Sequence, residues 1–394
     1  MFSKRFPPDL SPNPLTVAVR ALEREGRAYI NLTESNPTRA GFEYAADLLA
    51  PLADSRALAY RPEPFGLLDA RRAVARDYER QGLAVAPDRI VLTASTSEAY
   101  SLLFKLLADA GDEVLVPRPS YPLFDHLTRL DLVTTVPYEI EYHGRWSIDL
   151  DSVQRALGPR TRAVLVVSPN NPTGSFLSRD ELDRLAALCA SRGIALIADE
   201  VFADYEIEPG AAARAGRPAT RADVVSFSLG GLSKTIGLPQ AKLGWIAVAG
   251  PDALVLDALG RLELVCDTYL SVSTPVQVAA AQLLERGAAI RAQIAARVRA
   301  NHQHLAAQIA SVPSCGLLRA EAGWYAVVQV PTLESEDDLV LALLNDRGVL
   351  AHPGYFFDFP RESFLVVSLL PPEHLFRDGV GRVLRHFDCT APRR

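Results

Sequence analysis

A lysine stands in the glycine-flanked stretch SLGGLSKTIG, residues 228–237. The chain has 41 lysine and arginine residues, and only four are lysine: Lys4, Lys105, Lys234 and Lys242. Arginine stays protonated in proteins, whereas a lysine amine can lose its proton and attack a carbonyl. Lys234 therefore indicates chemistry that a guanidinium cannot perform, such as imine formation with an aldehyde. The alternative is an ordinary solvated surface lysine.

Polar side chains also follow other apolar runs. Asp199 follows IALIA, Asn171 lies shortly after AVLVV, and Ser95, Thr96 and Ser97 stand where RIVLTAS passes into a helical pattern. A carboxylate can pair with a protonated ring nitrogen, and an amide can donate to a phenolate oxygen. Hydroxyls and backbone N–H groups at the start of a helix can bind a phosphate, helped by the helix dipole.

An aromatic side chain completes this set, because Tyr121 in RPSYP can stack on a flat ring. Pyridoxal phosphate needs these groups: it has an aldehyde, a pyridine nitrogen, a ring hydroxyl, a phosphate and a planar face. Each residue also has a structural alternative, namely a helix cap for the serines and Asp199, a turn for Asn171 and core packing for Tyr121. A nucleotide P-loop is excluded at GGLSKT, because Ser233 replaces the glycine required before the lysine.

The elements that must position these residues alternate between strand and helix up to about residue 285. The runs AVLVV and IALIA lack two-residue alternation, which is typical of strands covered by helices on both faces. The segment 178–193 predicts a helix that begins with a capping box, Ser178 and Glu181, and ends at Gly193. We expect an α/β fold, a mostly parallel sheet sandwiched by helices. Ligands bind at the carboxyl ends of strands in such sheets, which predicts one shared pocket.

After about residue 285 the pattern changes. One long amphipathic helix is expected over 282–312, followed by strand-like and helical segments that form a smaller α+β unit. The predicted division is an N-terminal arm over 1–30 that packs with the small domain, a large ligand-binding domain over 31–285, and a small C-terminal domain over 286–394.

Composition excludes several classes of function. The net charge of −6 offers no basic field for nucleic acid, and no stretch of about 18 apolar residues could span a membrane. The first residues, MFSKRFPPDL, do not resemble a signal peptide. The four cysteines are scattered without a metal-binding pattern, and we expect no metal site and a cytoplasmic protein with reduced thiols: Cys189, Cys266, Cys315 and Cys389.

The motifs VPRPSYP, SPNNPTG, ADEVFADY and SLGGLSKTIGLPQAKLGW, in this order, resemble the fold type I pyridoxal phosphate-dependent aminotransferases, the aspartate aminotransferase-like class I/II. YRPEPFG and HPGYFF also fit, and the resemblance covers nearly the whole chain. It implies an enzyme that moves an amino group between an amino acid, or an amine, and a 2-oxo acid by a ping-pong mechanism, in a homodimer. A lyase or decarboxylase on the same fold is one alternative. A cofactor-binding regulator without turnover is the other.

The resemblance also implies roles for single residues. Lys234 would hold the cofactor through a Schiff base and shuttle a proton, and Asp199 would keep the ring nitrogen protonated. Asn171 would bond the ring hydroxyl, and Tyr121 would stack on the ring. The phosphate would be bound by residues from three segments, one of them in the partner subunit: Ser95, Thr96, Ser97 and Lys242, with Tyr60 from the partner.

Two departures from the family affect the cofactor site. Phe202 stands where many relatives have a tyrosine bonded to the ring oxygen, and phenylalanine cannot donate a hydrogen bond. Gly231 replaces a serine that frequently contacts the phosphate.

A third departure concerns the substrate. Val366 in FLVVSLL replaces the arginine that usually binds the substrate carboxylate. The best replacement is Arg39 in ESNPTRAG, a segment that also contains Asn36 and that in relatives crosses the mouth of the pocket. Arg61, which the partner subunit could donate, is second. The alternatives are two solvated surface arginines, or a substrate without a carboxylate at this place.

Overall fold

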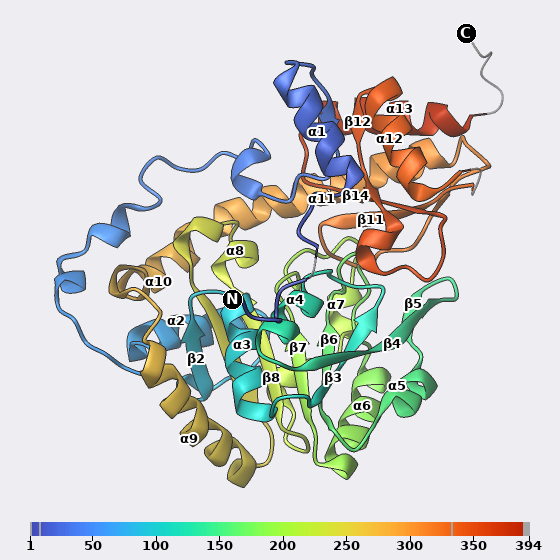
Figure 1. The fold of residues 1–394 in the computed structure, drawn as a ribbon. Coiled ribbons are helices and arrows are strands. Elements are labelled where there is room, and N and C mark those ends of the chain that lie inside the picture. The colour runs from blue at the N-terminus through green and yellow to red at the C-terminus, as the bar shows by residue number, and fades with distance from the viewer. Residues whose placement is uncertain (1, 8, 332–333, 389–394) are drawn as a thin grey trace.

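The computed structural model of the chain describes residues 2–7, 9–331 and 334–388, and an eight-stranded sheet dominates it (Figure 1). The strand order is β2-β9-β8-β7-β6-β3-β4-β5. β8, β7, β6, β3 and β4 run parallel, whereas β9 is antiparallel to both its neighbours and β5 to β4. The prediction of a mostly parallel sheet is confirmed. The bounds are β2 Ile90–Thr93, β3 Glu113–Arg118, β4 Thr134–Tyr142, β5 Trp146–Ile148, β6 Thr161–Val167, β7 Ala195–Asp199, β8 Ser226–Gly231 and β9 Gly244–Ala249.

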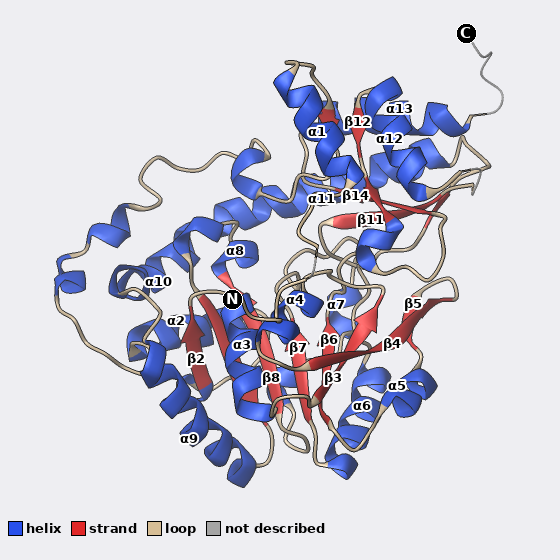
Figure 2. Cartoon of the chain, viewed as in Figure 1, coloured by secondary structure: helices blue, strands red, loops and turns tan. Residues whose placement is uncertain are grey.

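Helices cover both faces of this sheet, as Figure 2 shows. Alternate residues of β7 enter two separate hydrophobic clusters: Leu196 and Ala198 belong to one, Ala195 and Ile197 to the other. Both faces are buried, and for this reason the strands show no alternation of polarity. The helices that follow the strands are α2 Leu68–Arg80, α3 Thr96–Leu107, α4 Phe124–Leu130, α5 Leu150–Ala156, α6 Arg179–Arg192, α7 Ala211–Arg214, α8 Leu232–Thr235 and α9 Asp252–Tyr269.

The ends of α6 follow from local sequence. The Ser178 side chain accepts a hydrogen bond from the Glu181 backbone, and the Glu181 carboxylate accepts one from the Ser178 backbone. Gly193 ends the helix in the left-handed conformation, with φ 65°, which glycine adopts without steric cost. The predicted capping box and glycine terminus are confirmed.

The C-terminal part forms a second, four-stranded antiparallel sheet in the order β10-β11-β14-β13. It lies beside the large sheet and carries its own helices (Figure 1). β1 (Ile30–Asn31) pairs in parallel with β12 (Val349–Leu350), and α1 (Pro14–Arg24) packs against α12. The other bounds are β10 Gly316–Leu317, β11 Tyr325–Gln329, β13 His352–Pro353, β14 Phe364–Ser368, α12 Glu336–Arg347 and α13 Glu373–Phe387.

The prediction of a single helix over 282–312 is wrong. The structure has two helices, α10 (Thr274–Arg286) and α11 (Ala288–Ile309), which meet at Gly287. A Cβ at Gly287 would lie 2.6 Å from the Ile236 Cβ, so the close packing requires glycine there. Glycine is a weak helix former, and the helix is interrupted at this residue.

In the described ranges, no helix combines the length and the apolar character that a membrane span requires. Cys189, Cys266 and Cys315 are free thiols. Cys389 lies outside the described residues.

Candidate active site

Strand direction brings the predicted residues to one edge of the large sheet. β6, β7 and β8 are parallel, so their carboxyl ends meet there. Asn171 follows β6, Asp199 ends β7, and Lys234 lies in α8, directly after β8. These residues line one cleft with a volume of about 320 Å³, a size typical of small-molecule sites.

Most of the residues predicted to bind the cofactor line this cleft. β2 ends at the same edge as β8 because both are antiparallel to β9, which explains how the start of α3 reaches the cleft. The predicted residues on its wall are Ser95, Thr96, Ser97, Tyr121, Asn171, Asp199, Lys234 and Lys242. Phe202 and Gly231 also line it.

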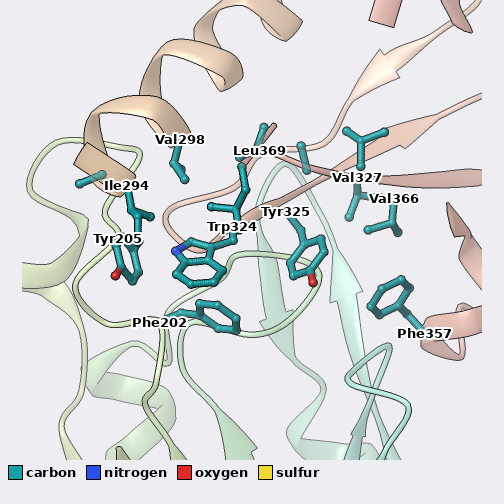
Figure 3. Packing of buried hydrophobic residues seen from close by; sticks show 14 of the residues in the cluster. Phe202, Tyr205, Ile294, Val298, Trp324, Tyr325, Val327, Phe357, Val366 and Leu369 are labelled. Atoms are coloured by element: carbon teal, nitrogen blue, oxygen red, sulfur yellow. The ribbon is translucent and has the colours of Figure 1, made fainter. Parts of the chain in front are cut away.

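The Lys234 amine lies among aromatic rings. Its Nζ is 4.8 Å from the ring centroid of Trp324 and 5.6 Å from that of Phe202. Figure 3 shows these two rings packed together below the small sheet. Burial lowers the pKa of Lys234 to about 8, and the negative charge of Asp199 opposes this shift only in part. Among the described residues Lys234 makes no ion pair within 4 Å, so its amine is free to react.

Asp199 is held by two donors. Its Oδ2 accepts a hydrogen bond of 2.9 Å from the Tyr100 hydroxyl, and its Oδ1 accepts one of 3.2 Å from the Val201 backbone. Burial raises the pKa of Asp199 to about 6, whereas the two hydrogen bonds and Lys234 lower it. The carboxylate is therefore ionised at neutral pH and can stabilise a cation in the cleft.

The start of α3 provides an anion site on the wall of the cleft. The Ser95 side chain caps the helix by accepting from the Glu98 backbone at 3.1 Å. The N–H groups of Thr96 and Ser97 belong to the first turn, which has no intrahelical acceptors, and the helix dipole favours an anion there. Lys242 adds a positive charge. These groups together suit a phosphate.

An unpartnered amide tests whether a cofactor fits. The buried Oδ1 of Asn171 has no hydrogen-bond partner among the described residues, although it lies on the cleft wall. Buried polar atoms are normally paired, so this side chain is suited to a ligand. With the lysine amine, the carboxylate and the anion site, the residues fit pyridoxal phosphate. In the described residues no group of three or more His, Cys, Asp or Glu side chains could hold a metal ion.

Close packing explains why glycine, and not serine, stands at position 231. A Cβ on Gly231 would lie 3.2 Å from the Leu243 carbonyl oxygen and 3.3 Å from the Gly244 Cα, which is tighter than ordinary contact. A serine at this place would need the adjacent strand to move. Phe202 is buried edge-to-face against Trp324, with ring centroids 5.3 Å apart.

Five predicted residues lie outside this cleft. Tyr60 is 73% exposed and lines a separate depression together with Arg61. Asn36 caps the 3₁₀ turn Pro37–Arg39, accepting from the Thr38 backbone at 3.0 Å, and Arg39 is exposed. Val366 is fully buried in β14, where it pairs with Val327 and His352.

Ser35, Tyr100 and Tyr325 are among the residues of the cleft wall that were not predicted from the sequence. Tyr100 had a usable signal: it lies one helical turn after Thr96, on the face of α3 that begins at the cleft. Ser35 belongs to ESNPTRAG, the segment expected at the mouth of the pocket, whereas no local pattern points to Tyr325.

Solved structures share the fold of this chain. Alanine aminotransferase from Pyrococcus furiosus superposes with a TM-score of 0.86 at 23% identity, covering 98% of this chain and 99% of that one. An aminotransferase from Escherichia coli gives a TM-score of 0.84 at 22% identity, covering 99% and 98%. At this identity the likeness establishes the fold.

Sequence relatives and the family match identify the family of the chain in addition to its fold. The chain is 26% identical over 365 residues to glutamate-pyruvate aminotransferase AlaA of Escherichia coli, covering 90% of each chain. It is 27% identical over 366 residues to an alanine aminotransferase of Mycobacterium tuberculosis, covering 89% of this chain and 83% of that one. Residues 27–375 match the family of class I and II aminotransferases. The chain therefore belongs to this family and is a pyridoxal phosphate-dependent aminotransferase.

Proposed function

We propose that Lys234 binds pyridoxal phosphate covalently and that the enzyme moves an amino group from an amino acid to a 2-oxo acid. The observation that carries this assignment is the amine beside Trp324 and Phe202, whose pKa burial lowers to about 8. An amine that is partly neutral near physiological pH can attack an aldehyde. Lys105, in contrast, forms an ion pair with Asp131 on the protein surface.

When bound, the cofactor supplies an aldehyde for the amino group and a ring that withdraws electrons from the reacting carbon. The chain's own residues hold and orient it. Asp199 would keep the ring nitrogen protonated, the unpartnered Oδ1 of Asn171 would accept a hydrogen bond from the ring hydroxyl, and Tyr121 would lie against the ring face. The Lys234 amine would accept the proton from the substrate Cα and return it.

The phosphate would be held at the start of α3. The N–H groups and hydroxyls of Thr96 and Ser97, with the Ser95 hydroxyl, are suited to donate to its oxygens. The Lys242 ammonium would balance part of the charge.

The working form would be a cytoplasmic homodimer in which Tyr60 and Arg61 of each subunit complete the cleft of the other. Three large hydrophobic side chains are exposed in the single chain, which supports a surface that a partner subunit covers: Leu58, Tyr60 and Tyr269. The three described free cysteines are typical of a reducing compartment. We also propose the division into an arm over 1–30, a large domain over 31–285 and a small domain over 286–394, which the β1–β12 pairing supports for the arm.

For the substrates we propose an α-amino acid and a 2-oxo acid of the kind named in the relatives, glutamate, alanine and pyruvate. Val366 is buried, and no arginine is among the described residues that line the cleft. The substrate carboxylate would therefore be bound by Arg39, with Arg61 of the partner subunit as the second candidate. Among the described residues Arg39 makes no ion pair that would compete with a substrate.

The covalent assignment is tested by reducing the holoenzyme with borohydride and mapping the labelled peptide. The label is expected on Lys234. A label on Lys105 or Lys242 would contradict the assignment.

The reaction is tested with the holoenzyme and a single amino donor, without an acceptor. Transamination is expected to release one 2-oxo acid per bound cofactor and then stop, until pyruvate, 2-oxoglutarate or glyoxylate is added as acceptor. Continuous release of carbon dioxide or of an elimination product would favour a decarboxylase or a lyase on the same fold.

A further inference from the structure

The contact between Tyr100 and Asp199 connects α3 with the end of β7. Tyr100 belongs to α3, the helix whose first residues form the anion site. Its hydroxyl donates to the Asp199 Oδ2 at 2.9 Å, and both side chains are buried. One rigid helix thus carries groups that reach the anion site and the carboxylate.

The Tyr100 ring is fixed by its neighbours. It stacks on Phe104 with ring centroids 6.1 Å apart and meets Phe124 edge-to-face at 5.5 Å. Its hydroxyl has little freedom to move away from Asp199. Burial and the nearby carboxylate raise the pKa of Tyr100 well above its usual value, so the hydroxyl stays a donor throughout the physiological range.

We propose that Tyr100 is a positioning residue, whose hydroxyl holds the Asp199 carboxylate in place and in its ionised form for the nitrogen of the cofactor ring. The inference rests on the proposed function of the cleft. Asp199 accepts one hydrogen bond on each oxygen, from Tyr100 and from the Val201 backbone. Removing the hydroxyl would leave Oδ2 without a donor in a buried site, which disfavours the charge.

Other charged groups also face Asp199, and they influence how strongly the loss of the Tyr100 hydroxyl would change the pKa of Asp199. Lys234 in α8 favours the ionised carboxylate, whereas Glu200 in the adjoining loop disfavours it. The Glu200 charge is balanced by Arg217, at 2.7 Å. The charge of Asp199 also raises the pKa of Tyr121. Tyr100 is the one side chain among the described residues that bonds Asp199 directly.

The test is an infrared titration of the Asp199 carboxyl in the full-length apoprotein, with Asp199→Asn to identify its band. Tyr100→Phe keeps the ring and is expected to raise the midpoint by about one pH unit, because one donor to the ionised form is lost. The matched control is Tyr121→Phe, which removes a cleft hydroxyl that is not bonded to Asp199, and a shift of less than about 0.3 unit is expected. An unchanged midpoint in Tyr100→Phe would overturn the proposal.

A second measurement does not depend on the stability of that variant. 3-Fluorotyrosine in place of Tyr100 is a stronger hydrogen-bond donor, and it is expected to shift the Asp199 midpoint to lower pH. A midpoint that stays the same or rises would overturn the proposal.

Cofactor binding gives a third measurement. Tyr100→Phe is expected to bind pyridoxal phosphate about fivefold more weakly at pH 6, because a midpoint raised by about one unit from about 6 lowers the ionised fraction of Asp199 from about 0.5 to about 0.1. In the Asp199→Asn background the same change is expected to have no further effect. An equal loss in both backgrounds would overturn the proposal. A borohydride label away from Lys234 would instead overturn the function assigned to the cleft, because the titration needs no cofactor.

Discussion

The cleft at the edge of the large sheet has polar side chains without protein partners among the described residues, whereas the core around Val366 consists of packed apolar side chains. The cleft holds the Lys234 amine, whose pKa burial lowers to about 8, and an unpartnered amide oxygen at Asn171. Val366 is fully buried among apolar side chains, beside Val327 and Phe357 (Figure 3). The cleft keeps polar groups available for a ligand at a cost in stability, whereas the core around Val366 is packed for stability. Changes in the cleft should therefore alter chemistry, and changes near Val366 should alter folding.

The largest effect is expected for Asp199→Asn. Without a carboxylate the ring nitrogen loses its proton, and the chemical step is expected to slow by about 10²–10⁴-fold, or roughly 3–5 kcal/mol. The free energy of unfolding of the apoprotein should fall little or even rise, because a buried charge is removed. Single-turnover kinetics and urea unfolding measure the two quantities. A chemical step within tenfold of the unmodified enzyme would show that Asp199 has another role.

The next effect tests how a carboxylate is bound if the Val366 region cannot bind it. Arg39→Ala is expected to cost about 2–5 kcal/mol in kcat/KM for an amino acid substrate, because the carboxylate loses its charged partner. The amine that lacks the carboxylate serves as the matched control and should lose little. Arg61→Ala, measured on the same pair, tests the second candidate.

Equal losses for both substrates, or no loss for either, would remove Arg39 from the site. Strong activity of the unmodified enzyme on the simple amine would instead favour an amine substrate.

Val366→Ala tests whether the core around Val366 contributes to stability and not to ligand binding. Removing two buried methyl groups is expected to lower the free energy of unfolding by about 2 kcal/mol, through lost burial and a small cavity. The dissociation constant for pyridoxal phosphate should stay unchanged, since Val366 does not line the cleft. Urea unfolding and a cofactor titration test both statements. Unchanged stability together with altered substrate selection would assign Val366 to the substrate site.

The predictable part of this molecule is the part that depends on local sequence. The capping box at Ser178 and Glu181 and the apolar strands β6 and β7 follow from short patterns. The shared cleft follows from strand direction, because parallel strands bring polar residues after them to one edge. No contact between distant segments had to be known.

The unpredicted part depends on contacts between distant segments. Tyr100 and Asp199 are 99 residues apart, and the interruption at Gly287 depends on Ile236. The burial of Val366 depends on strand pairing with Val327 and His352. Register and packing of this kind are set by the whole fold, and a local pattern does not specify them.

The smallest effect is a pH dependence that belongs to the cleft alone. In the unfolded apoprotein Lys234 binds its proton up to the ordinary pKa of 10.5, whereas in the folded chain burial lowers that pKa to about 8. Between these values the unfolded state binds more protons, so the free energy of unfolding rises with pH. Lys234→Met should abolish this rise, which is expected to be on the order of 1–2 kcal/mol because the side chain is only half-buried. Urea midpoints of the apoprotein at pH 7.5 and 9.5 measure it, with Val366→Ala as the control that should keep the unmodified slope. The same slope in Lys234→Met would mean that the amine is solvated in the folded chain, and the physical contrast between the two regions would then be smaller than the structure indicates.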